Sequence, residues 1–147
     1  MFKVKIIAVG KIKEEYFQQA VAEYVKRAGR YAEVKIVEVK EENFCAEPSD
    51  KEKEIILEKE CEGILKEVKG RVFALAIEGK KISSEGLKDL IKKSKDAGEE
   101  LTFIIGGSYG LADKVKRAAT LVSFSDMTFP HTLFRVMLTE QIYRAFN

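Results

Sequence analysis

Short apolar runs and stripes of helical spacing alternate along the whole chain. Five short segments rich in apolar or β-branched residues predict strands at residues 3–9, 33–39, 71–77, 101–105 and 120–124. Helical spacing, together with capping residues and glycine stops, predicts helices at about residues 14–27, 49–68, 83–98, 112–119 and 132–146. Residues 71–77 and 101–105 are almost entirely apolar, which is typical of strands that a parallel sheet buries on both faces.

The order of these elements predicts the fold class. Strands that alternate with helices form a mostly parallel sheet, and the connecting helices cover both of its faces. Ser49 followed by Glu52 is a capping-box pattern, and Glu78-Gly79-Lys80 is expected to turn the chain after the third strand. The sequence has no internal repeat, linker or low-complexity tract, so we expect one α/β domain over residues 1–147.

The composition excludes several classes of protein. No window approaches the roughly 18 uncharged apolar residues of a membrane helix, and the N-terminus mixes charged and apolar residues, unlike a signal peptide. Two cysteines, Cys45 and Cys61, are too few for a secreted disulfide framework, and with a single histidine they form no metal-binding pattern. We therefore expect a cytoplasmic protein with free thiols and no metal. The net charge of +2 neither indicates nor excludes a nucleic-acid partner.

In open parallel sheets, ligands bind beyond the carboxyl ends of the strands. Three such ends stand out, at residues 75–79, 105–110 and 124–130. The adjacent glycines Gly106 and Gly107 let a ligand approach the bare backbone, although a tight turn without a ligand would use them equally well. The segment matches neither the Walker loop nor the dinucleotide fingerprint, which disfavours a nucleoside triphosphate or a dinucleotide.

Two features of the last third point to a ligand and to a partner. Met127 and Phe129 could wall an adenine, and His131 is the only histidine, although such residues more often cap a core or make a structural hydrogen bond. The last helix is apolar on more than one side through Leu133, Phe134, Val136, Met137, Leu138, Ile142, Ala145 and Phe146. One domain of this size rarely buries so many, so the pattern predicts a homodimer in which this helix packs against its symmetry mate.

Several segments together resemble a known family. Ile104-Ile105-Gly106-Gly107-Ser108-Tyr109-Gly110-Leu111, the run Ser123 to His131 and the run Glu140 to Ala145 are similar to the bacterial 23S rRNA pseudouridine N3 methyltransferases, the RlmH family of the SPOUT superfamily. The opening Ala8-Val9-Gly10-Lys11 and the stretch from Ser83 to Leu87 match as well. The resemblance covers the whole chain in order, and the combination is specific although each part alone is weak.

The resemblance implies a fold, a cofactor and a substrate. The C-terminal part would be threaded into a trefoil knot, and the cofactor would be S-adenosylmethionine. The substrate would be a pseudouridine in 23S rRNA of the assembled ribosome, methylated by a homodimer in which the partner completes each active site. The residues expected at the cofactor site are Leu75, Gly106, Gly107, Phe124, Ser125, Asp126, Met127, Thr128, Phe129 and Pro130.

The chemical roles are hypotheses. His131 follows the cofactor loop and is a candidate for proton handling, and Arg135 is a candidate for stabilising charge that develops on the base. Family members carry a short further segment ending in Pro-Tyr-His and a basic residue, so we expect a chain ending at Asn147 to keep cofactor binding and to lose turnover. Two other functions stay open: a dimeric nucleotide- or RNA-binding module without catalysis, and a flavodoxin-like binding domain.

Overall fold

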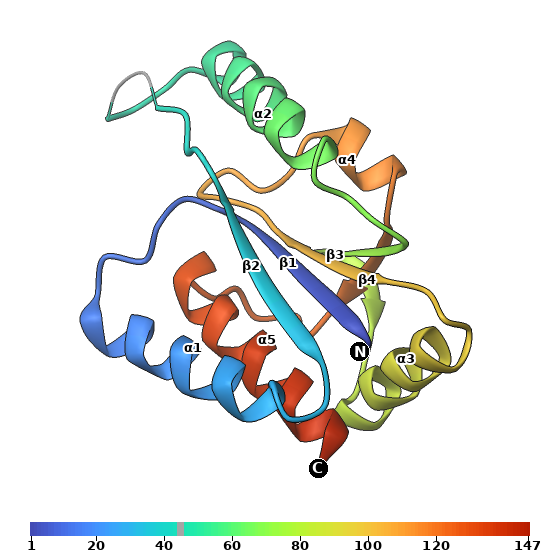
Figure 1. Cartoon of the computed structure of the whole chain (residues 1–147). Helices are drawn as coiled ribbons and strands as arrows, with labels where there is room; N and C mark the ends of the chain where they lie inside the picture. The colour runs from blue at the N-terminus through green and yellow to red at the C-terminus, as the bar shows by residue number, and fades with distance from the viewer. Residues whose placement is uncertain (44–45) are drawn as a thin grey trace.

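The structure contains the expected alternation of strands and helices in full (Figure 1). It is a computed structural model that describes residues 1–43 and 46–147. In chain order the elements are β1 (Lys3–Val9), α1 (Glu15–Ala28), β2 (Glu33–Val39), α2 (Asp50–Leu65), β3 (Arg71–Lys81), α3 (Ser84–Asp96), β4 (Leu101–Ile105), α4 (Asp113–Arg117), β5 (Thr120–Ser123) and α5 (His131–Phe146).

The five strands form one sheet in the order β2-β1-β4-β3-β5. Every pairing between these strands is parallel, and Ile6 of β1 lies opposite Ile36 of β2 on one side and Phe103 of β4 on the other. The expectation of a parallel α/β fold is therefore confirmed. Because parallel strands end at the same edge, the carboxyl ends of all five strands meet on one side of the molecule.

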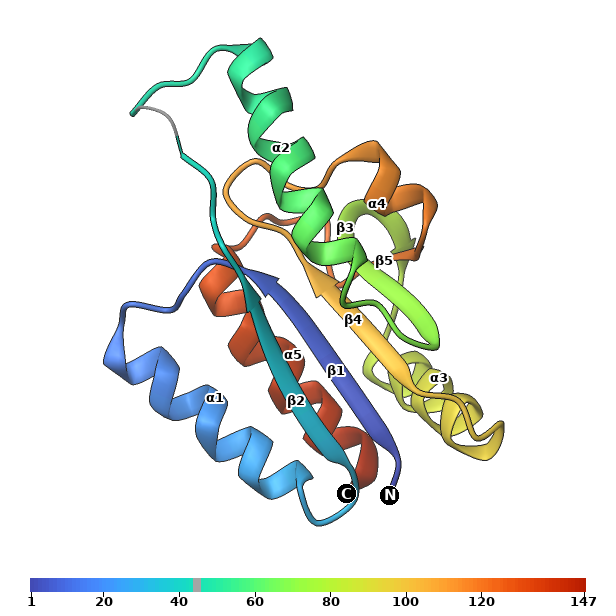
Figure 2. The same ribbon diagram turned by 45° about the horizontal axis from the view of Figure 1, so that its top comes forward.

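Helices cover both faces of the sheet, as expected (Figure 2). Ile6 and Phe103 belong to the core on the face that α1, α3 and α5 cover. Ile7 and Ile104, one residue further along, belong to the core beneath α2 and α4. Alternate residues of a strand point to opposite faces, so neighbouring apolar residues in β1 and β4 supply both cores.

The two apolar strands differ in burial. All residues of β4 are buried, as predicted, whereas Ala74 is the only fully buried residue of β3. The prediction that both faces of residues 71–77 are buried holds for residues 72–75, which pack against the two cores, and fails at Ile77, which is 50% exposed. The β3–β5 ladder shifts register between Leu75 and Lys80, so the expected turn at Glu78-Gly79-Lys80 is a bulge within a longer strand. Leu75, Ala76 and Ile77, which precede the bulge, line a cavity described below, and Leu75 also packs against the core.

Glycine is required inside this bulge. A Cβ at Gly79 would lie 2.6 Å from the backbone nitrogen of Val122. The bulged backbone therefore approaches β5 more closely than a side chain allows, and β3 bends around the end of the shorter strand.

Helix α5 lies between α1 and α3 beneath the sheet (Figure 1). Leu138 and Ile142 are fully buried against that core, while Leu133, Val136 and Met137 are half-buried. One chain thus covers more of this helix than its sequence suggested. The half-buried side remains available for a partner.

Three smaller expectations concern α2, the thiols and the membrane. The capping box at Ser49 and Glu52 is present, with Ser49 Oγ accepting from the backbone nitrogen of Glu52 at 3.2 Å. Cys61 is free and buried, and Cys45 lies outside the described residues. Within the described part of the chain, no helix has the length and apolarity to cross a membrane, and no group of metal-ligating side chains could hold an ion.

Candidate functional site

A cavity of about 380 Å³ opens at the carboxyl edge of the sheet. Three segments from distant parts of the sequence surround it: residues 75–78 of β3, residues 105–111 from the end of β4 onward, and residues 123–131 from the end of β5 to the start of α5. Its volume lies in the range of small-molecule sites, which are mostly apolar with a few polar groups. The three strand ends singled out in the sequence therefore meet at one site.

The turn after β4 needs its glycines. A Cβ at Gly106 would lie 2.6 Å from the carbonyl oxygen of Gly110, and Gly110 itself has a φ of +83°. The backbone nitrogen of Gly110 donates to the carbonyl oxygen of Gly107 at 3.2 Å and closes the turn. The result is a stretch of bare backbone along the cavity wall, which leaves space for a ligand close to main-chain donors and acceptors.

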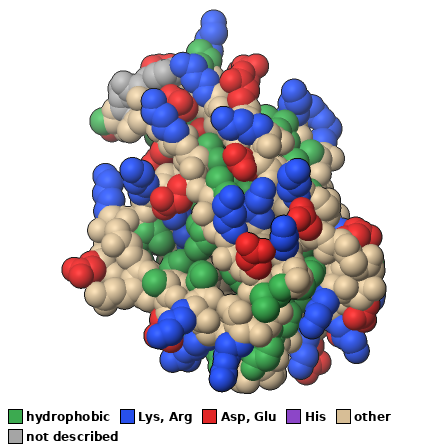
Figure 3. All heavy atoms as spheres, in the orientation of Figure 1, with side chains coloured by type: hydrophobic (Ala, Val, Ile, Leu, Met, Phe, Trp, Pro, Cys, Tyr) green, Lys and Arg blue, Asp and Glu red, His purple; other side chains and the backbone are tan. Residues whose placement is uncertain are grey.

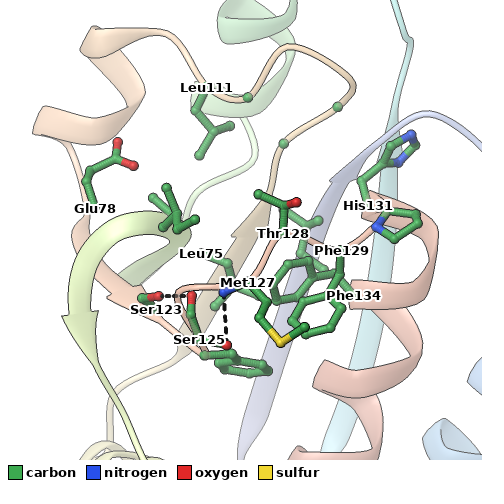
Figure 4. Close-up of a pocket in the computed structure, with 18 of the residues that line it drawn as sticks. Leu75, Glu78, Leu111, Ser123, Ser125, Met127, Thr128, Phe129, His131 and Phe134 are labelled. Carbon is green, nitrogen blue, oxygen red and sulfur yellow. Dashed lines mark hydrogen bonds between the residues drawn. The ribbon is translucent and has the colours of Figure 1, made fainter.

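The loop between β5 and α5 forms the opposite wall. Ser123 Oγ donates to the carbonyl oxygen of Ser125 at 2.9 Å, and the backbone nitrogen of Met127 donates to Ser125 Oγ at 3.0 Å. Phe129 packs edge-on against Phe134 of α5, with 5.4 Å between ring centroids. Figure 4 shows Met127, Phe129 and Phe134 grouped on this side of the cavity, across from Glu78 and Leu111.

A charged pair crosses the other side of the cavity. Lys116 Nζ of α4 lies 2.7 Å from Glu78 Oε1 of the β3 bulge, and both residues line the cavity. The Lys116 ammonium lowers the pKa of the Glu78 carboxyl. Glu78 is therefore ionised at neutral pH, and with Lys116 it forms an ion pair of no net charge on this wall.

The structure brings together most of the residues expected at the cofactor site. Those that line the cavity are Leu75, Gly106, Gly107, Phe124, Ser125, Met127, Thr128, Phe129 and Pro130. Asp126 lies in the same loop, but its carboxylate pairs with Lys81 Nζ at 2.5 Å on the exposed surface and does not line the cavity. The sequence thus located the site, while the orientation of this one side chain depends on a tertiary ion pair.

The two candidates for chemistry lie in different surroundings. His131, the first residue of α5, lines the cavity, and its buried Nδ1 has no hydrogen-bond partner among the described residues. Figure 4 shows its imidazole at the edge of the site, apart from Met127 and Phe129. Arg135 does not line the cavity and is only 2% exposed.

Arg135 holds the ends of two strands together. Its Nη1 donates to Glu38 Oε2 at 2.7 Å, and its Nη2 donates to the carbonyl oxygen of Gly10 at 3.0 Å. A buried guanidinium paired in this way fixes the ends of β1 and β2 against the first turns of α5. The structure therefore places Arg135 away from the cavity at which it was expected to stabilise charge on the base.

Some residues of the site carried no signal in the sequence. Glu78 and Lys116 are ordinary surface types in the sequence, and only the bulge of β3 and the short α4 bring them together. Leu111 closes the turn and is buried at its base. Leu111 is the last residue of the glycine-rich motif, so the sequence did contain a signal for it. No spacing in the sequence predicts that Lys116 of α4 would pair with Glu78 of β3.

Known proteins resemble this chain over its full length. The sequence profile of the family described as "Predicted SPOUT methyltransferase" matches residues 2–147. The ribosomal RNA large subunit methyltransferase H of Caldicellulosiruptor saccharolyticus is 46% identical over 147 residues, which cover 98% of this chain and 94% of that protein. A putative ribosomal RNA large subunit methyltransferase H of Methanococcus vannielii is 47% identical over 148 residues, covering 98% and 93%.

Solved structures share the fold at much lower identity. A putative methylase family protein from Neisseria gonorrhoeae has a TM-score of 0.58 at 13% identity and covers 97% of this chain and 82% of that chain. A second structure, reported as "Structural insights into the 2-OH methylation of C/U34 on tRNA", has a TM-score of 0.53 at 13% identity. The match covers 99% of this chain and 92% of that chain. Taken with the profile match and the relatives, the parallel sheet and its glycine-lined cavity lead to one assignment: this chain belongs to the SPOUT methyltransferase family.

Proposed function

We propose that this protein transfers a methyl group from S-adenosylmethionine to N3 of a pseudouridine in the RNA of the large ribosomal subunit. The observation that carries the proposal is the cavity in which the strand ends meet, in a chain nearly half identical to a ribosomal RNA large subunit methyltransferase H. The same relationship supports a cytoplasmic location, where ribosomes are found.

The residues around the cavity suit this cofactor. Phe129, Met127 and Leu75 offer apolar surface for an adenine, and the bare backbone at Gly106 and Gly107 offers main-chain hydrogen bonds without side chains in the way. Glu78 offers a carboxylate to the hydroxyls or the cationic groups of the ligand. The bound cofactor would supply a methyl group already activated on a sulfonium, so the protein's task is positioning and proton handling.

The proton on N3 of the base must leave before this nitrogen can act as a nucleophile. His131 is the side chain at the cavity that best suits this task, because it lies at the cavity edge and its Nδ1 lacks a partner among the described residues. We assign Arg135 a different role: it holds the first turns of α5, and with them His131, against the ends of β1 and β2.

We further propose that the C-terminal part forms a trefoil knot. Strand β5 lies at the edge of the sheet, whereas α5 lies beneath its middle against α1 and α3. The chain returns between these places through residues 124–130, the same loop that walls the cavity. A knot would fix this loop at both ends, which suits a ligand site made largely of backbone.

The active unit is proposed to be a homodimer built on the half-buried side of α5. Val136 and Met137 line a second depression with Tyr24, Ile82 and Phe124, and a partner would cover these apolar side chains together with the polar residues beside them. Met137→Glu should convert the dimer into a monomer in light scattering, whereas Ile142 is fully buried and a charge there would unfold the chain. A wild-type monomer at micromolar concentration would contradict the dimer.

The surface also bears on how RNA would bind. Figure 3 shows basic side chains spread over this face with acidic ones among them, so the face drawn is not uniformly positive. RNA binding would then depend on a modest number of phosphate contacts and should weaken as salt is added.

The decisive experiment is methyl transfer to ribosomes that lack the modification, followed by mass spectrometry of the 23S rRNA. We expect methylation at a single pseudouridine that depends on S-adenosylmethionine. Retention of labelled cofactor without any transfer would favour a binding module. Failure to retain the cofactor would favour a flavodoxin-like binding domain and contradict the proposal.

A further inference from the structure

A buried carboxylate lies next to the glycine turn but does not line the cavity. Glu60 of α2 is only 4% exposed, and its Oε1 lies 3.7 Å from the position that a Cβ on Gly107 would occupy. Its Oε2 accepts a hydrogen bond from the backbone nitrogen of Glu42 at 3.1 Å. Glu60 thus lies close to the cavity turn and accepts a hydrogen bond from the loop that follows β2.

The loop after β2 and the rest of α2 contact the same turn. Ser108 Oγ donates to Glu41 Oε1 at 3.1 Å. Lys53 Nζ of α2 lies 5.4 Å from the centre of the Tyr109 ring. Glu60, Glu41 and Lys53 therefore lie close to three consecutive residues of the turn, residues 107–109. Figures 1 and 2 both show α2 lying over the segment that leads from β4 to α4.

Core packing alone does not account for a glutamate at this position. An apolar residue would fill the space beneath the turn without the cost of removing a carboxylate from water. The carboxylate instead accepts a main-chain hydrogen bond that ties the 41–43 loop to α2. The loop in turn places Glu41 where it accepts from Ser108, so the contact chain from α2 to the cavity wall is continuous.

We propose that Glu60 and Glu41 are positioning residues that hold the Gly106–Gly110 turn in the shape that binds the cofactor. Neither side chain lines the cavity, so both act through the turn, Glu60 at Gly107 and Glu41 at Ser108. This inference rests on the proposed function only in taking S-adenosylmethionine as the probe ligand.

The surroundings of Glu60 make this positioning sensitive to pH. Burial, helped by the negative charges of Glu41 and Glu42, raises the pKa of Glu60 to about 7, although the hydrogen bond from the Glu42 backbone acts in the opposite direction. The nearest residue of the turn, Gly107, carries no charge. On the side of α4, the positive charge of Lys114 lowers the pKa of Cys61, the residue that follows Glu60. Ionised Glu60 is the stronger acceptor for the Glu42 nitrogen, so cofactor affinity should rise with pH between about 6 and 8.

The test measures cofactor affinity by calorimetry and amide exchange of residues 107–110 in cofactor-free protein. Glu60→Ala should weaken affinity about tenfold and speed amide exchange in the turn, as expected for the loss of a charged hydrogen bond. Glu60→Gln keeps an acceptor and should retain most of the affinity, but its affinity should no longer change with pH as that of the wild type does. Glu58→Ala, at an exposed position of the same helix, is the matched control and should change nothing.

Glu41 is tested by a double-mutant cycle that does not depend on the folding of Glu60 variants. Glu41→Ala and Ser108→Ala should each weaken affinity, and the double variant should be no weaker than the worse single one, because one contact is lost in every case. Additive losses, or unchanged affinity and amide exchange in Glu60→Ala, would overturn the inference. If wild-type protein itself fails to bind S-adenosylmethionine, the proposed function fails. The amide exchange still tests whether Glu60 and Glu41 hold the turn, a role called the brace below.

Discussion

The two walls of the cavity are built in different ways. The Gly106–Gly110 turn is held from outside by α2 and by the loop after β2, through Glu60, Glu41 and Lys53. The 124–130 loop is held by local hydrogen bonds of Ser123 and Ser125, by aromatic contacts to α5, and by one exposed ion pair between Asp126 and Lys81 of β3. Met127 in this loop is 68% exposed. The first wall therefore has a fixed shape, whereas the second has fewer contacts that oppose movement.

This difference suggests a division of labour at the site. A braced turn keeps main-chain groups in place before the cofactor arrives, which lowers the entropic cost of binding. A loop with local contacts can adjust around the ligand and can open for substrate and product. Disturbing the turn should therefore cost more affinity than disturbing the loop.

The largest expected effect comes from a side chain inside the turn. Gly106→Val places its Cβ against the carbonyl oxygen of Gly110, 2.6 Å away, so the turn must open even before a ligand enters. We expect S-adenosylmethionine affinity to fall more than about 100-fold in calorimetry while circular dichroism stays native. Gly98→Ala is a control at the far end of the sheet, where a Cβ meets nothing within 4 Å but the φ is +71°. It should cost about 1 kcal/mol of stability and no affinity.

The burial of the Glu60 carboxyl should have its own signature in stability. In the folded protein the pKa of Glu60 is raised from 4.5 to about 7, so the folded state binds this proton more tightly than the unfolded state. The contribution of Glu60 to the free energy of unfolding is therefore largest below pH 4.5 and is lost as the pH rises to about 7, by up to about 3 kcal/mol.

Urea unfolding of wild type and Glu60→Gln between pH 4 and pH 8 measures this loss as a difference between the two proteins. Glu78 has a lowered pKa and contributes with the opposite sign below pH 4.5, but it is the same in both proteins and cancels. A difference that stays constant over this range would mean that Glu60 titrates like an exposed residue and that the turn lacks a buried brace.

The sequence predicted the fold and the residues that line the cavity better than it predicted the residues that hold those segments in place. Gly106 and the 124–130 run could be found because their residue types are demanded locally, by the turn and by the family motif. The burial of the strand end at Ile77 was overestimated, because an apolar strand end that lines a cavity has the same composition as one in a core. Glu60 and Arg135 could not be assigned, since only tertiary contacts decide whether a charged side chain of a helix is solvated or buried.

An aromatic residue of the loop should have an intermediate effect. Phe129→Ala removes apolar surface from the cavity and the edge-on contact to Phe134, so affinity should fall about tenfold. Phe146→Ala is the matched control, because Phe146 stacks on Tyr31 at the other end of α5 and its loss should lower stability without lowering affinity. An unchanged affinity in Phe129→Ala would show that this wall does not contact the cofactor.

The smallest effect is expected from the loss of a hydrogen bond inside the loop. Comparing it with the loss of a hydrogen bond in the turn tests the difference between the two walls most directly. Ser125→Ala and Ser108→Ala each remove one hydroxyl, but Ser125 Oγ accepts from Met127, two residues away, whereas Ser108 Oγ donates to Glu41, across 67 residues of sequence. A local contact re-forms or is replaced by water at little cost, so Ser125→Ala should weaken affinity only about threefold or less. Ser108→Ala releases the turn from its brace and should weaken affinity clearly more. Ser84→Ala, which removes an exposed hydroxyl between α3 and α5, should leave affinity unchanged. If calorimetry finds the loop and turn variants equally weak, the two walls are equally constrained, and the adjustable loop inferred from its local contacts is wrong.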